Sequence, residues 1–129
     1  MQETLLADQY MRRLVGKAIS EGRYVLFRGV RSEKIDEMSD LETPYIIACT
    51  EQQGQTVFNE GFLEGRLYDV DGAVDVSGTI TQTGVELTLP ARQQKYSANS
   101  EIPMLYEGQW KGRKNEGKWT LELLLGREI

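Results

Sequence analysis

Three aromatic residues in the C-terminal part of the chain are the best candidates for contact with a ligand. Tyr106 and Trp110 stand four residues apart in one run of alternating residue types, and Trp119 stands in the next run. Residues separated by an even number of positions share one face of a strand, so these side chains are expected to face inward. We predict Tyr106, Trp110 and Trp119 as ligand-binding residues; the alternative is that the same rings form an ordinary core.

The chain contains no histidine. Histidine is the base in Ser-His-Asp and Cys-His catalysis and the commonest zinc ligand, so its absence argues against these classes of site. No phosphate loop or dinucleotide fingerprint is present, because the glycines separate strand-like runs and none opens a helix after a strand. The sequence therefore names no catalytic residue, no metal ligand and no cofactor. An enzyme that works through two carboxylates paired across strands is a third hypothesis.

Three carboxylates near Gly72 suggest calcium at first sight. A calcium loop that begins at Asp69 needs glycine at its sixth position and glutamate at its twelfth, where the chain has Val74 and Ile80. A hairpin turn at Asp71-Gly72 is the prediction instead.

Composition and charge describe one globular domain and restrict its partners. The chain has 129 residues, of which 40% are apolar and 27% are charged, and this suits a single core for residues 1–129. Acidic residues outnumber basic ones by 20 to 15, and the resulting net charge of −5 repels phosphate backbones and anionic lipids. We expect neither nucleic acid nor membrane as a partner.

The cysteine content indicates the compartment. Cys49, the only cysteine, follows an apolar run without a basic neighbour, so a buried and unreactive thiol is expected. The N-terminus lacks a basic segment followed by an apolar run, and no apolar run is long enough to cross a bilayer. A single unpaired cysteine and the absence of a glycosylation sequon favour a cytoplasmic location.

The elements that must position the aromatic residues follow from hydrophobic spacing. Apolar residues at steps of three and four predict a helix over residues 4–20, and Gly22 suits its end. Residues 23–125 show short β-branched and aromatic runs between glycine-containing turns. Strands are predicted near Arg23–Val30, Tyr45–Thr50, Thr56–Val70, Ala73–Thr81, Val85–Leu89, Met104–Arg113 and Lys118–Leu125, with Arg92–Tyr96 as an eighth candidate, a turn at Gln53-Gly54, a loop or short helix at Arg31–Thr43 and a loop at Ser97–Glu101.

The short connections predict a mainly β fold, an antiparallel up-and-down barrel of about seven or eight strands with one N-terminal α-helix. A curved open sheet or a sandwich is the alternative. Alternation predicts that Leu63 and Leu67 point inward and that Phe62 and Tyr68 point outward. The same rule turns Met104 and Leu125 inward and Leu124 outward.

Residues of the C-terminal half carry a family resemblance. The matching residues are Ser77-Gly78-Thr79-Ile80, Val85–Leu89, Tyr96, Tyr106-Glu107-Gly108 and Glu116–Leu121. In this pattern the chain resembles small lipocalin-like, or calycin-like, meander barrels. The resemblance implies a barrel that holds a small apolar ligand, and it brings no catalytic residues with it.

Two functions are compatible with these features. The first is a binding module that holds a small apolar or aromatic molecule against Tyr106, Trp110 and Trp119, with the N-terminal helix covering one end of the barrel. The second is an interaction module filled by its own side chains. Its outer surface, including Phe62 and Tyr68 or the helix, would bind a protein partner or a second copy of the chain.

Overall fold

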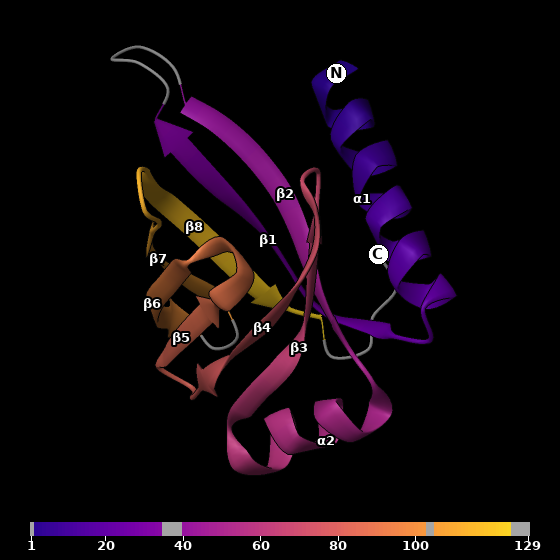
Figure 1. The fold of residues 1–129 in the computed structure, drawn as a ribbon, viewed down its shortest axis with the longest axis vertical. Helices are drawn as coiled ribbons and strands as arrows, with labels where there is room; N and C mark the ends of the chain where they lie inside the picture. Colours follow the sequence, from indigo (N-terminus) through magenta and orange to yellow (C-terminus); the bar gives the residue numbers. More distant parts are fainter. Residues whose placement is uncertain (1, 35–39, 103–104, 125–129) are drawn as a thin grey trace.

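The computed structural model describes residues 2–34, 40–102 and 105–124. Over these residues the chain forms helix α1, eight strands, helix α2 between β2 and β3, and a short 3-10 turn η1 between β5 and β6 (Figure 1). The elements are α1 (Gln2–Ser20), β1 (Tyr24–Lys34), β2 (Asp40–Cys49), α2 (Glu51–Glu60), β3 (Phe62–Asp69), β4 (Gly72–Ile80), β5 (Gly84–Leu89), η1 (Pro90–Arg92), β6 (Gln94–Ile102), β7 (Leu105–Lys111) and β8 (Glu116–Leu123).

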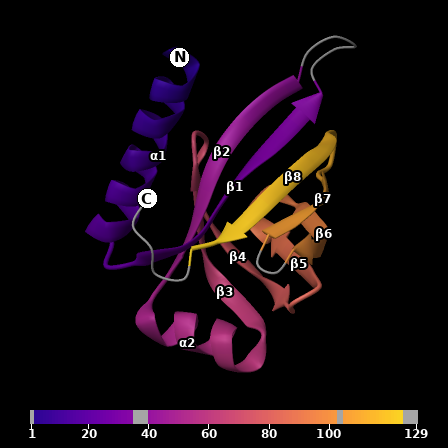
Figure 2. The same cartoon turned by 180° about the vertical axis from the view of Figure 1, so that it is seen from behind.

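The strands close into an antiparallel barrel in which each strand pairs with the next along the chain. The barrel closes between the first and last strands, from Phe27 opposite Leu123 to Arg31 opposite Trp119 (Figure 2). Alternation produces the barrel wall: in β5, for example, the residues at positions 85, 87 and 89 are buried and those between them are exposed. The predicted mainly β, up-and-down barrel with an N-terminal helix is confirmed.

Helix α1 lies along the outside of the barrel, against β1, β2 and β3 (Figures 1 and 2). Its buried residues Leu14 and Ala18 pack on an apolar patch of the outer wall made by Ile46, Ala48 and Tyr68. The prediction that this helix covers an end of the barrel is therefore wrong. Tyr68 points outward as predicted, but the helix covers it completely.

Helix α2 lies where the sequence predicts a turn at Gln53-Gly54 and the start of a strand at Thr56. Both assignments are wrong, because Thr50 caps a helix: its Oγ1 accepts from the Gln53 N–H at 3.4 Å, and its own N–H donates to Gln53 Oε1 at 3.1 Å. The helix ends at Gly61, whose φ of 72° suits glycine. Figure 1 shows α2 across one end of the barrel, hereafter the α2 end.

Two further assignments differ from the prediction. The acidic segment Arg31–Thr43 is mostly strand, since β1 and β2 pair as far as Lys34 opposite Asp40, and residues 35–39 lie outside the described part. The predicted loop at Ser97–Glu101 lies within β6, which pairs with β5 through Asn99. In both places, hydrogen bonding to neighbouring strands overrides weak local preferences.

The interior faces agree with the alternation. Leu63, Leu67, Tyr106, Trp110, Trp119, Leu121 and Leu123 are all buried in one cluster inside the barrel. Leu124 was expected to face outward, yet it is buried, and its N–H donates to the Leu26 carbonyl oxygen at 2.8 Å. Met104 and Leu125 lie outside the described residues. Neither helix, as far as the structure describes it, has the length and apolar character needed to span a bilayer.

Candidate functional site

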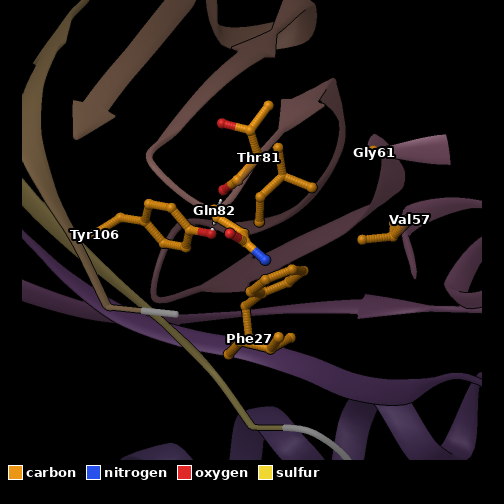
Figure 3. A pocket seen from close by; sticks show the side chains of 8 residues that line it. Phe27, Val57, Gly61, Thr81, Gln82 and Tyr106 are labelled. Carbon is orange, nitrogen blue, oxygen red and sulfur yellow. Dashed lines mark hydrogen bonds between the residues drawn. The ribbon is translucent and has the colours of Figure 1, made fainter. Parts of the chain in front are cut away.

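A pocket of about 240 Å³ lies at the α2 end of the barrel (Figure 3). Its walls come from four strands, β1, β4, β7 and β8, from the β4–β5 turn and from α2 with its C-cap, so the closed barrel fixes the positions of the strand residues. The lining residues are Phe27, Val57, Gly61, Ile80, Thr81, Gln82, Tyr106 and Leu123.

Most of the pocket surface is apolar. Phe27, Val57, Ile80 and Leu123 are buried side chains that leave their edges facing the pocket. The register of β1 shifts between Val25 and Phe27, and such an irregularity re-aims side chains. Surfaces of this kind bind apolar groups because binding removes them from water.

Polar groups gather on one side of the pocket. The Tyr106 hydroxyl donates to the Thr81 carbonyl oxygen at 2.6 Å, and Figure 3 shows this side chain reaching toward the Thr81 and Gln82 segment. The Thr81 hydroxyl is engaged within its own turn, where it accepts from the Gly84 N–H at 3.1 Å and donates to the Gly84 oxygen at 3.2 Å. Burial raises the pKa of Tyr106, so its hydroxyl is neutral at physiological pH.

The two tryptophans lie in the barrel interior and are absent from the pocket lining. Trp110 stacks on Tyr96 with ring centroids 5.8 Å apart, and Trp119 meets the same tyrosine edge-on at 5.1 Å. Their indole N–H groups are satisfied, Trp110 by the Ser32 oxygen at 2.9 Å and Trp119 by two backbone oxygens of β6 and β7. The structure therefore places Tyr106 in the pocket and the tryptophans together in a packed aromatic cluster.

A charged network inside the barrel was missed by the sequence reasoning. At the end away from α2, Arg92 donates two hydrogen bonds to the Asp69 carboxylate at 2.6 and 2.8 Å. Arg31 approaches the same carboxylate at 3.2 Å, binds Asp71 at 2.9 Å and lies over the Trp110 ring. The members come from β1, β3, the β3–β4 turn and η1, so no local spacing reveals their pairing. Alternation from Phe27 would have placed Arg31 inward.

Two other features considered in the sequence, the acidic segment near Gly72 and Cys49, lie outside the pocket lining. A hairpin turn is confirmed here, one residue earlier than predicted: Asp69 pairs with Gly72, so Val70 and Asp71 form the turn, and Asp69 Oδ1 accepts from the Asp71 N–H at 2.9 Å. Cys49 is a buried free thiol, as predicted; it donates to the Glu64 oxygen at 3.2 Å, and burial raises its pKa to about 12. Within the described residues, no group of three or more acidic or cysteine side chains is arranged to hold a metal ion.

No signal in the sequence marked the apolar pocket residues, because Phe27, Val57, Ile80 and Leu123 have the types and spacing of core residues. Only Tyr106 was singled out, through its alternation with Trp110. Comparison with known proteins adds no further lead: no protein-family model and no curated protein sequence matches the chain.

Proposed function

We propose that the protein is a lipocalin-like binding module that takes one small apolar or aromatic molecule into the pocket at the α2 end. The observation that carries this proposal is the apolar lining formed by Phe27, Val57, Ile80 and Leu123. An engineered apolar cavity of about 150 Å³ is large enough to hold benzene. A pocket of about 240 Å³ is therefore suited to a molecule of one or two rings.

The proposal divides the three predicted ligand-binding residues by position. Tyr106 lines the pocket and is given direct contact with the ligand. Trp110 and Trp119 pack around Tyr96, and in this proposal they keep the barrel wall rigid and do not contact the ligand. A rigid, preformed pocket binds with less loss of conformational freedom than a mobile one. We further propose a cytoplasmic location, which the free, buried thiol of Cys49 supports.

One observation favours the second candidate, an interaction module. The aromatic cluster and the Arg31–Asp69–Arg92 network fill the half of the barrel away from α2 with the chain's own side chains. Phe62 is 46% exposed on the outer wall and is available to a protein partner or a second copy. Tyr68, the other aromatic residue predicted on this surface, is not available because α1 covers it.

The test is a titration with a fluorinated toluene, followed by fluorine NMR. Saturable binding to wild type is expected, and Val57→Phe, which places a larger side chain in the pocket, should abolish it. The matched control is Val70→Phe, because Val70 is 61% exposed in the β3–β4 turn and outside the pocket lining. Lack of saturable binding to folded wild type would reject the ligand carrier. Native mass spectrometry of the same sample then tests for a second copy.

A further inference from the structure

We infer that the ligand is a neutral aromatic molecule carrying one N–H or O–H donor, as in the phenol and indole classes, and that this donor binds the Tyr106 hydroxyl oxygen. The inference rests on the proposed function and names its ligand class. Three features of the pocket support it: the direction of the Tyr106 hydrogen bond, the engagement of the neighbouring polar groups, and the absence of charged side chains from the part of the lining that the structure describes.

The Tyr106 hydroxyl is fixed as an acceptor toward the pocket. Its proton is committed to the Thr81 carbonyl oxygen, which lies at 2.6 Å. A phenolic hydroxyl has one proton and further acceptor capacity on its oxygen. A ligand that approaches this oxygen must therefore supply a proton, and a ligand that offers only an acceptor would leave two lone pairs facing each other.

The other polar groups of the lining leave this role to Tyr106. The Thr81 hydroxyl donates to the Gly84 oxygen at 3.2 Å and accepts from the Gly84 N–H at 3.1 Å. Thr81 is exposed, so water competes for the acceptor capacity that remains on its hydroxyl. Gln82 is exposed, so water competes for its amide. Tyr106 is only 1% exposed, so water has little access to its side chain. Discrimination by hydrogen bonding is strongest where water cannot replace the missing partner.

The lining also excludes ionised ligands. Among the residues that the structure describes, the lining contains no lysine, arginine, aspartate or glutamate. A carboxylate or ammonium group carried into this apolar pocket would lose its water without gaining an opposite charge, and that loss is costly. The charged groups of the barrel interior, Arg31, Asp69 and Arg92, lie at the other end and bind one another. The ligand class is accordingly neutral.

The experiment compares indole with benzofuran, which has nearly the same shape and lacks the N–H donor. Dissociation constants are measured for wild type, Tyr106→Phe and Tyr24→Phe. Tyr24 is the matched control because its hydroxyl also donates to a backbone oxygen, that of Glu51 at 3.3 Å, and it does not line the pocket. The benzofuran-to-indole ratio of dissociation constants should fall roughly two- to tenfold in Tyr106→Phe, as expected for one hydrogen bond, and stay unchanged in Tyr24→Phe.

An unchanged ratio in folded Tyr106→Phe overturns the inference and leaves the proposed function standing, provided that wild type binds both molecules. Failure of wild type to bind either molecule overturns both. If Tyr106→Phe does not fold, the proton spectrum of nitrogen-labelled indole bound to wild type decides the matter. A downfield shift of the indole N–H supports the hydrogen bond, and an N–H resonance unchanged from indole in an apolar solvent overturns the inference.

Discussion

Arg31 of β1 and Asp69 of β3 form an ion pair inside the barrel, with 3.2 Å between Nη1 and Oδ2. The Asp69 side chain has no exposed surface, and the same carboxylate binds Arg92 through two hydrogen bonds. One buried carboxylate thus lies between two guanidinium groups. Buried charges of this kind matter most when one is removed, because the others remain without a partner.

We therefore expect Asp69→Asn to lower the free energy of unfolding by about 3–5 kcal/mol, since it leaves Arg31 and Arg92 facing each other without a negative charge between them. Urea unfolding measures the loss. The control is Glu122→Gln, which breaks the ion pair between Glu122 and Arg28. Both of these side chains are 42% exposed. That pair should contribute about 0.2–1 kcal/mol. Equal losses in the two variants would contradict the inward location of Asp69.

Trp110→Ala should lower the free energy of unfolding by about 3–5 kcal/mol, because the ring is buried against Tyr96 and its removal leaves a cavity. Trp110→Phe should lower the free energy of unfolding by less, because an aromatic ring still fills most of the space. Its remaining cost includes the lost hydrogen bond to the Ser32 oxygen. Denaturant unfolding gives both values. Where Trp110→Phe remains folded, its affinity for the fluorinated toluene should match wild type, and a large loss of affinity would place the ligand against Trp110 instead.

Stability should fall at alkaline pH. Burial raises the pKa of the Cys49 thiol from its ordinary value of 9.0 to about 12, so the unfolded chain ionises first. The contribution of Cys49 to the free energy of unfolding is fully present below pH 9 and is lost as pH rises toward 12. In this range the free energy of unfolding falls by about 1.4 kcal/mol per pH unit for one group. Burial raises the pKa of Tyr45 as well, in the same direction. The slope should be smaller in Cys49→Ala; an identical slope would show that Cys49 does not contribute.

Gly16→Ala should raise the free energy of unfolding by about 0.5–1 kcal/mol, because Gly16 lies inside α1 and alanine is the better helix former. A Cβ added there meets no atom within 4 Å. The opposite outcome is expected for Gly108→Ala in β7, where the added Cβ would collide with the Ser97 carbonyl oxygen. Thermal unfolding compares the two. A destabilising effect of Gly16→Ala would argue that α1 is not helical at this position.

The barrel was predictable because hydrophobic alternation is a local signal that each strand carries by itself. Helix α2 was missed although its signal was present: Thr50 followed three residues later by Gln53 is a capping box, and Gly54 was read as a turn instead. The segment Arg31–Thr43 carried no alternation, so its strands depend on pairing with each other. Local sequence does not encode that dependence.

The candidate site was predictable only in part. Tyr106 could be placed inward by alternation, but the position of the pocket depends on α2, whose Val57 forms one wall. The burial of Tyr68 depends on where α1 lies, and no residue of β3 indicates that a helix covers its outer face. The Arg31–Asp69–Arg92 network joins three elements far apart in sequence. Such long-range arrangements follow from closure of the barrel and not from spacing.

The seam between β1 and β8 has a consequence for biosynthesis. As the chain leaves the ribosome, β1 emerges before the other strands of the barrel, and its partner on this side, from Trp119 to Leu123, emerges after all of them. Until then the growing sheet is open and β1 presents an unpaired edge, the kind of edge that recruits strands from other chains. Helix α1 is made before any strand and packs on β1, β2 and β3, so it can cover their apolar outer patch during this interval. The nascent edge itself stays open until β8 arrives.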